Sequence, residues 1–316
     1  MKDFKPDFLF RSSFIQSYLA SSGKRLWKPD TSNYFLIVAN GVKFSGYCDY
    51  TDKPSRGTIV FIHGWEGSAN SSYSMRGSRY FLNLGFDVIR LNLRDHGDSH
   101  SFNIEPFHGC RLEETYELIK KLTSDSKKPF HLIGFSLGGS YVSRLALKAS
   151  QKNGLKNVSS YFAISPSIQP KKATARIEEN PIYRFYFLKS WKKSLDLKKK
   201  FFPDYYDEKD WKNAKSVMSL TEKLVTKYGG FASLDSYFNG YAIDNKDFKK
   251  LKRNLYILIS KDDPIIPHED FEKLEPNSFL EITSTNYGGH NGFLQNVFNP
   301  PKFLDWVYER ILRLHF

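Results

Sequence analysis

The chain has 316 residues, 40% hydrophobic and 16% aromatic, which is enough to bury one large core or two small ones. No stretch approaches the ~20 consecutive apolar residues that cross a bilayer, and the start, MKDFKPDFLFRSS, lacks the apolar core of a signal peptide. Two cysteines, Cys48 and Cys110, are too few for a disulfide framework or a metal cluster. We therefore expect a cytoplasmic protein with reduced thiols and without a metal or other cofactor.

The formal net charge of +13 raises the question of an acidic partner. The lysines that dominate this excess are scattered, with small clusters at Lys171-Lys172, Lys192-Lys193 and Lys198-Lys199-Lys200. None of these clusters lies in a nucleic-acid-binding motif, so we interpret them as a solvated basic surface and expect no nucleic acid partner. Weak contact with an acidic lipid surface stays open, and the sequence does not fix the oligomeric state.

The first half of the chain predicts alternating strands and helices. Residues 34–50 predict two strands joined at Asn40-Gly41, a dipeptide favoured in tight hairpin turns. Further strands are predicted over 58–62, 87–91, 130–133 and 158–164, and helices over 73–84, 111–122 and 137–150. Short connections between such elements are typical of a parallel sheet with helices on both faces.

The pattern changes after Pro166. Up to about Asp244 the sequence is rich in aromatic residues and lysines and shows no strand alternation, which predicts a mostly helical insertion. Strands at 255–259 and 279–282 then continue the sheet, with a helix near 267–274 and a final helix over 300–314. We expect an α/β core of residues 1–165 and 245–316, and a helical lid of residues 166–244 at the edge where strands end and sites form.

A candidate nucleophile follows the strand that ends near Ile133. Residues 134–138, Gly-Phe-Ser-Leu-Gly, match the Gly-x-Ser-x-Gly pattern of a nucleophile elbow, in which a sharp strand-to-helix turn exposes the serine hydroxyl. The flanking glycines let neighbouring backbone approach closely. Ser136 is therefore the predicted nucleophile, against the alternative of an ordinary glycine-rich turn.

A serine hydroxyl needs a base within hydrogen-bond reach and a group that orients the base, and in this fold class the chain order is Ser, then Asp or Glu, then His. A carboxylate pair, Asp262-Asp263, follows the strand that begins at Leu255, and His290 lies in a glycine-rich loop after the last strand. We predict Asp263 as the acid and His290 as the base, with Asp262 as the alternative acid. Activity is then expected to fall as the imidazole protonates, near the ~6.5 reference pKa of histidine.

Negative charge on the attacked carbonyl oxygen requires preorganised N–H donors. One is expected from Leu137, directly after the nucleophile at the start of a helix. The other is expected from Trp65 in the loop His63-Gly64-Trp65-Glu66-Gly67, which follows the 58–62 strand. We expect His96, in the loop after the next strand, to hold that loop by hydrogen bonds rather than to catalyse.

These segments resemble those of the α/β-hydrolase superfamily over nearly the whole chain. A closer resemblance is to the subgroup of plant embryogenesis-associated proteins, bacterial predicted hydrolases and medium-chain ester esterases and acyltransferases. It rests on four segments: Phe4-Lys5-Pro6 with the apolar run that follows, residues 63–71, residues 228–237 and Gly289-His290-Asn291-Gly292-Phe293. The resemblance implies a mostly parallel eight-stranded sheet with helices on both faces and a lid, and a serine esterase that acts through an acyl-enzyme.

The substrate is less constrained by the sequence. Aromatic residues of the insertion, of which we select Tyr183, Phe187 and Trp191, are candidates to line an apolar lid over an acyl chain, although they could equally form the insertion's own small core. We expect hydrolysis of a small-molecule ester with a short or medium acyl chain. Acyl transfer to an alcohol and a non-catalytic binding module are the alternatives, and the second would normally have lost a member of the triad.

Overall fold

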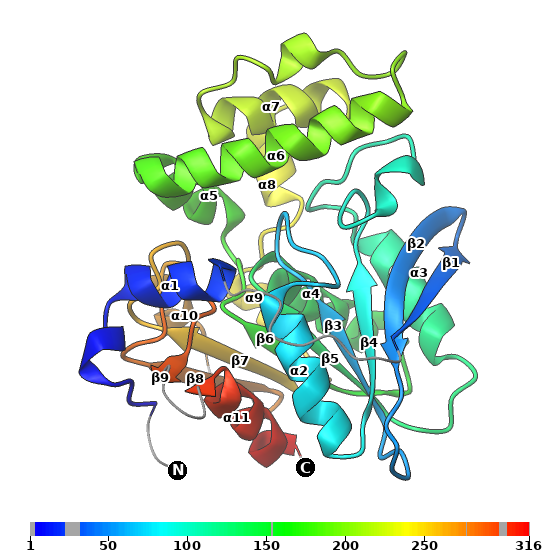
Figure 1. Cartoon of the computed structure of the whole chain (residues 1–316), viewed down its shortest axis with the longest axis vertical. Coiled ribbons are helices and arrows are strands. Elements are labelled where there is room, and N and C mark those ends of the chain that lie inside the picture. The colour runs from blue at the N-terminus through cyan, green and yellow to red at the C-terminus, as the bar shows by residue number, and fades with distance from the viewer. Residues whose placement is uncertain (1–3, 23–31, 153, 276, 297–301, 316) are drawn as a thin grey trace.

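The computed structural model describes residues 4–22, 32–152, 154–275, 277–296 and 302–315 (Figure 1). Its central feature is an eight-stranded sheet with the strand order β1-β2-β4-β3-β5-β6-β7-β8. The strands are β1 (Asn33–Ala39), β2 (Val42–Asp49), β3 (Thr58–Ile62), β4 (Asp87–Asn92), β5 (Phe130–Phe135), β6 (Val158–Ile164), β7 (Leu255–Ser260) and β8 (Leu280–Thr285). All pairs from β4 to β8 are parallel, while β2 is antiparallel to both β1 and β4. The predicted mostly parallel sheet is confirmed.

The hairpin at the start of the sheet forms at the predicted dipeptide. Ala39 pairs with Val42, so Asn40 and Gly41 are the two turn residues. Their φ angles of 47° and 77° are both left-handed, the conformation that asparagine and glycine adopt most readily.

Helices cover both faces of the sheet, as predicted. On one face lie α2 (Ser72–Asn83) and α11 (Asp305–His315), whose Phe81 and Trp306 belong to one buried apolar cluster. On the other face α3 (Leu112–Thr123) and α4 (Leu137–Lys152) contribute Leu118 and Leu145 to a second cluster. The central strands are buried on both sides, which explains why their sequences are mostly apolar without alternation.

The segment predicted as a helical insertion is helical. It contains α5 (Pro170–Glu179), α6 (Pro181–Phe201), α7 (Val217–Lys227) and α8 (Leu234–Asn239), with the short η3 (Glu208–Asp210) between α6 and α7. Figure 1 shows α5 to α8 as a layer above the end of the sheet. The long helix α6 begins where the Asn180 side chain accepts hydrogen bonds from the Ile182 and Tyr183 N–H groups, with Pro181 in its first turn. Core and lid remain our proposed division of the chain.

Short elements complete the fold. They are η1 (Phe8–Phe10), α1 (Ser13–Ser22), η2 (Ser99–Ser101), α9 (Asn245–Phe248), α10 (Glu269–Glu272), β9 (Leu294–Asn296) and β10 (Lys302–Phe303). The prediction of a final helix over 300–314 was wrong at its start. Lys302 and Phe303 pair with β9 instead, and Leu304, buried and left-handed at φ 62°, ends this strand before α11 begins; residues 300 and 301 lie outside the described residues.

A buried ion pair fastens α6 to the core. The Lys198 ammonium donates to Asp95 Oδ1 at 2.6 Å, and both side chains are almost fully buried. Asp95 Oδ2 also accepts from the Phe107 N–H at 2.7 Å, and Lys198 donates to the Asn103 carbonyl. Burial raises the pKa of Asp95 to about 6, although the attraction of Lys198 opposes the rise, so the carboxyl is ionised at neutral pH and pairs with the lysine.

Replacing one partner of this ion pair should lower the free energy of unfolding more than replacing both. Asp95→Ala leaves a buried ammonium without its counter-charge, so we expect the free energy of unfolding to fall by about 3–5 kcal/mol. Asp95→Ala combined with Lys198→Met removes both charges and should recover part of that loss. Urea unfolding at neutral pH measures both variants; a double variant less stable than the single one would contradict the assignment.

Candidate active site

The turn between β5 and α4 has the strained geometry expected of a nucleophile elbow. Ser136 has φ 55°, an uncommon conformation for a residue other than glycine. Its N–H donates to the Ile164 carbonyl of the neighbouring strand at 2.8 Å. A Cβ at Gly134 would overlap the backbone of Gly138, and a Cβ at Gly138 would overlap the backbone of Ile62. The glycines are therefore required by packing, and they allow the turn to expose the serine.

Three side chains from separate loops form a chain of hydrogen bonds. Ser136 Oγ lies 2.9 Å from His290 Nε2, and His290 Nδ1 lies 2.9 Å from Asp263 Oδ2. Asp263 is itself held in place, because its Oδ1 accepts from the Ile265 and Ile266 N–H groups at 2.8 and 2.9 Å. This geometry is that of a nucleophile, a base and an orienting acid.

The two adjacent aspartates have different positions. Asp262 Oδ1 accepts from the Gly289 N–H at 2.9 Å, so this carboxyl holds the backbone of the histidine loop rather than the imidazole. Burial raises the pKa of Asp262. The geometry therefore favours Asp263 over Asp262 as the orienting acid, and the catalytic roles of all three residues stay predictions.

The helix α1 also holds the histidine loop, a role that sequence analysis did not find. Ser17 Oγ accepts from the His290 N–H at 2.8 Å. Gln16 makes two hydrogen bonds with the backbone of Leu294, accepting from its N–H at 2.7 Å and donating to its carbonyl at 2.9 Å. Both side chains are buried. More than 270 residues separate these partners along the chain, so no local pattern signals the contact.

The predicted oxyanion donors lie on either side of the serine. Leu137 is the first residue of α4, and a Cβ on Gly64, next to Trp65, would lie 3.2 Å from the Ser136 Cβ. The N–H groups of Gly64 and Glu66 donate to Tyr73 Oη and His96 Nε2. Within the described part of the chain, no hydrogen bond uses the N–H of Trp65 or Leu137. Both N–H groups are thus available, and their role stays a prediction.

Two buried histidines hold the Trp65 loop. His63 Nε2 accepts from the Leu93 N–H at 3.1 Å, and its Nδ1 donates to the Gly64 carbonyl at 2.7 Å. His96 Nε2 accepts from the Glu66 N–H, while its Nδ1 donates to the Arg94 carbonyl. Both rings accept through one nitrogen and are therefore neutral. Burial lowers the pKa of His63 to about 4 and that of His96 well below its ordinary value. His96 thus holds the loop, as expected.

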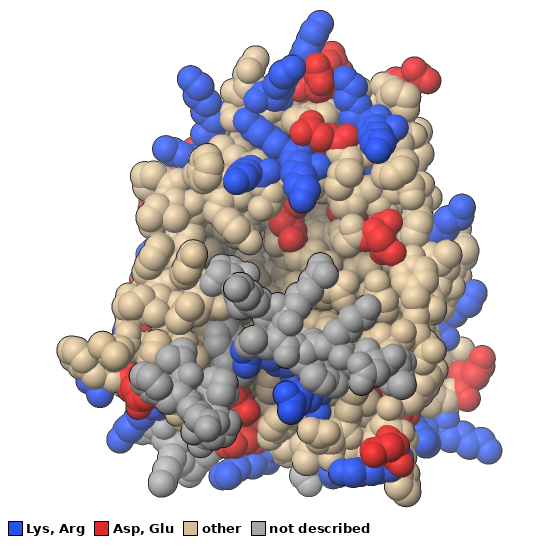
Figure 2. Space-filling view, in the orientation of Figure 1, with Lys and Arg blue, Asp and Glu red and all other residues tan. Residues whose placement is uncertain are grey.

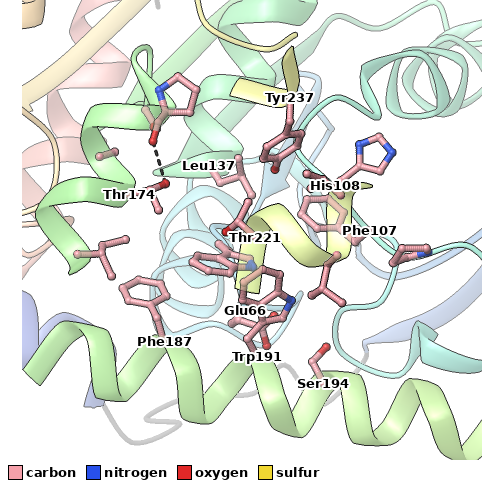
Figure 3. A pocket seen from close by; sticks show the side chains of 18 of the residues that line it. Glu66, Phe107, His108, Leu137, Thr174, Phe187, Trp191, Ser194, Thr221 and Tyr237 are labelled. Carbon is pink, nitrogen blue, oxygen red and sulfur yellow. Dashed lines mark hydrogen bonds between the residues drawn. The ribbon is translucent and has the colours of Figure 1, made fainter. Parts of the chain in front are cut away.

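A pocket extends from Ser136 beneath the helices α5 to α8 (Figure 3). Its cavity volume is about 110 Å³. Phe187 and Trp191 line it from α6, and both pack on the Trp65 ring at centroid distances of 5.0 and 4.9 Å. Tyr183, by contrast, is not among the lining residues.

One carboxyl group in the pocket was missed by the sequence reasoning. Glu66 lines the pocket beside Trp65, and its side chain forms no hydrogen bond or ion pair with a described residue (Figure 3). Burial, together with repulsion from Asp95, raises the pKa of Glu66 to about 8. The group is therefore mostly protonated at neutral pH and can act as a hydrogen-bond donor in the pocket.

No helix in the described ranges is both long and apolar enough to cross a bilayer. The two cysteines are free, and burial raises the pKa of each thiol to about 11. Neither thiol is thus poised to act as a nucleophile.

Comparison with known proteins identifies the fold family. A family model described as alpha/beta hydrolase fold matches residues 57–297. Among curated proteins, phospholipase ABHD3 of Bos taurus is 22% identical over 278 residues, covering 84% of this chain and 65% of that protein. The chain thus spans less than two thirds of this relative's length.

Solved structures share the fold at low sequence identity. An esterase of Pyrococcus furiosus superposes with a TM-score of 0.59 at 19% identity, over 91% of this chain and 92% of that one. An esterase of Exiguobacterium antarcticum gives a TM-score of 0.52 at 19% identity, over 88% and 97%. These likenesses extend beyond the serine and histidine loops to almost the whole chain.

The two aspartates provide a matched test of the orienting acid. Asp263→Asn keeps an oxygen for the Ile265 and Ile266 N–H groups but loses the charge that fixes the histidine tautomer, so kcat should fall by about 10⁴-fold. Asp262→Asn keeps an acceptor for the Gly289 N–H and should lower kcat by less than about tenfold. Steady-state hydrolysis of p-nitrophenyl butyrate measures both; the reverse order of effects would make Asp262 the acid.

The buried histidines predict acid sensitivity of the fold. His63 and His96 have lower pKa values folded than unfolded, so the unfolded chain binds more protons below pH 6.5 and stability falls as pH falls. As the pH falls from 6 toward 4, each histidine should lower the free energy of unfolding by up to about 1.4 kcal/mol per pH unit. His96→Asn should weaken this dependence, as measured by urea unfolding at pH 7 and pH 5. An unchanged slope in the variant would contradict a neutral, buried His96.

Proposed function

Because the chain belongs to the alpha/beta hydrolase fold family, we propose that it is a serine hydrolase that cleaves carboxylic esters through an acyl-enzyme. The observation that carries the proposal is the hydrogen-bonded series Ser136–His290–Asp263 at the pocket, with 2.9 Å at each step. The names of its relatives, a phospholipase and esterases, support an ester as the substrate. Similarity to the embryogenesis-associated and medium-chain esterase subgroup remains part of this proposal.

In the proposed reaction Ser136 Oγ attacks the ester carbonyl carbon while His290 Nε2 takes the hydroxyl proton. Asp263 accepts the Nδ1–H hydrogen bond and stabilises the imidazolium that forms. The negative charge on the carbonyl oxygen is stabilised by the N–H groups of Trp65 and Leu137. The tetrahedral intermediate then expels the alcohol, which receives the proton from His290, and leaves an acyl group on the serine.

The second half of the reaction repeats this sequence with water. His290 removes a proton from a water molecule, the water attacks the acyl carbon, and the released products are the carboxylic acid and free Ser136. An alcohol in place of water would yield a new ester, so acyl transfer uses the same residues. The choice between them depends on which nucleophile reaches the acyl-enzyme.

The apolar lining of the pocket supports an ester with an apolar acyl chain, which we propose to be short or medium in length. Apolar side chains from the core and from the proposed lid line the pocket, with Phe187 and Trp191 on one side. The other apolar lining residues include Ile177, Leu195, Leu224, Val225, Phe238, Ile265 and Ile266. Burying an acyl chain among them removes apolar surface from water, at roughly 25 cal/mol per Å².

Ser136→Ala tests the proposed nucleophile. It should lower kcat for p-nitrophenyl butyrate by at least about 10⁴-fold, with the circular dichroism spectrum unchanged. Ser140→Ala is the matched control, because Ser140 lies one helical turn further in α4 and its hydroxyl is buried without a partner among the described residues. Equal rates in Ser136→Ala and the parent would refute the proposal.

A series of p-nitrophenyl esters from acetate to palmitate, with and without excess ethanol, resolves the substrate class. The pocket predicts a maximum of kcat/KM at a short or medium chain. Ethyl ester formed in preference to free acid would assign the chain as an acyltransferase, whereas free acid as the main product assigns an esterase. A maximum at palmitate would contradict the predicted chain length.

A further inference from the structure

An exposed apolar face lies on three elements, η1, α1 and α6, of which α1 and α6 contact the candidate active site. The first part is the N-terminal segment of η1 and α1, where Phe8 is 79% exposed and Leu9, Phe14, Ile15 and Tyr18 are exposed with it. The second part is the first two turns of α6, where Phe185 is 68% exposed beside Ile182 and Tyr186. We call these eight residues the apolar face. Monomeric proteins rarely expose so many large apolar side chains together without a function.

The two parts of this face are neighbours. The Tyr183 hydroxyl of α6 interacts with Ser17 of α1, so the two helices meet there. Figure 1 places η1, α1 and the N-terminal end of α6 along the left side of the molecule. In Figure 2 the left side of this view, over α1 and that end of α6, is largely free of charged side chains.

The helix α6 has two distinct faces. Its inner face carries Phe187, Trp191 and Lys198, which line the pocket. Its outer face carries an exposed stripe with helical spacing: Ile182, Phe185, Tyr186, Lys189, Lys193, Asp196, Leu197 and Lys200. An apolar end followed by lysines along one face is the pattern of a helix that lies on a membrane surface, where the aromatic rings enter the headgroup region and the lysine stems extend to the phosphates.

The charges around the apolar face are almost all positive. Lys5 and Arg11 are exposed beside Phe8, and Lys189 and Lys193 follow Phe185. None of these four forms an ion pair with a described residue; Arg11 and Lys189 lie over the Phe8 and Phe185 rings at 5.9 Å. Residues 181–193 contain no acidic residue, and residues 4–19 contain only Asp7. A second copy of this chain would bring like charges together, whereas anionic headgroups would neutralise them.

We propose that the apolar face docks on a lipid surface that contains anionic lipids. The aromatic side chains would enter the interface and the surrounding lysines and arginine would contact phosphate groups. Docking would hold α6, which lines the pocket, and α1, whose Ser17 binds the backbone of His290, against the surface. An ester dissolved in the lipid would then lie beside the elements that form the site. The proposal concerns binding and does not require the proposed reaction.

The test is sedimentation of the full chain with vesicles of phosphatidylcholine alone and of phosphatidylcholine mixed with phosphatidylglycerol. The parent protein should bind the mixed vesicles and bind the neutral ones more weakly. Phe8→Glu combined with Phe185→Glu should weaken binding to mixed vesicles at least about tenfold, because it removes apolar contact and adds charge that anionic lipids repel. Lys189→Gln combined with Lys193→Gln should reduce the preference for phosphatidylglycerol.

Leu36→Glu is the control, because Leu36 is also a large apolar residue, 63% exposed, but lies on the edge strand β1. It should bind like the parent. None of these residues belongs to the candidate active site, so hydrolysis of soluble p-nitrophenyl butyrate should stay within about twofold of the parent in every variant. Vesicle binding without ester hydrolysis would refute the proposed reaction and leave the docking proposal intact.

Three outcomes would overturn the docking proposal. They are a parent protein that binds neither vesicle, a double glutamate variant that binds as the parent does, and a parent that is dimeric by light scattering while the glutamate variant is monomeric. The last would identify the apolar face as a contact between two copies of the chain.

Discussion

The close approach of three backbone segments at the elbow is the constraint on which the rest of the site depends. Ser136 is left-handed, and the backbone around it packs so tightly that only glycine fits at 134 and 138. This packing holds the serine at the strand-to-helix turn, within hydrogen-bond distance of His290. The strain is maintained by a sheet whose central strands are buried on both faces.

The groups around the serine are fixed from several directions. Asp263 is held by two backbone N–H groups, the His290 loop by Asp262 and Ser17, and the Trp65 loop by two neutral histidines. A catalytic site must be preorganised in this way, because a displacement of about 1 Å in its groups can remove much of the rate enhancement. The ion pair between Lys198 and Asp95 extends this arrangement to α6, which closes one side of the pocket. The helices over the site are thus fastened to the core by a buried charge as well as by apolar packing.

Much of this structure could be predicted from local sequence patterns, and the remainder could not. The strand over residues 58–62 is a short, almost wholly apolar run, so its bounds could be predicted from the sequence, and the Asn40-Gly41 turn could be predicted from its chemistry. The triad residues were selected because each follows a strand in the expected order. By contrast, the contacts of Gln16 and Ser17 depend on residues at the other end of the chain. The pairing of β10 with β9 is a tertiary effect, which overrides the helical pattern before Asp305.

The central claim is that Ser136 is the nucleophile that forms an acyl-enzyme, and covalent trapping tests it most directly. A fluorophosphonate ester reacts with an activated serine and leaves a phosphonyl group on its oxygen, which peptide mass spectrometry locates. The account predicts a single modification on the peptide that contains Ser136 and none in His290→Ala, whose serine lacks its base. Modification of another residue, or an active protein that remains unmodified, would contradict it.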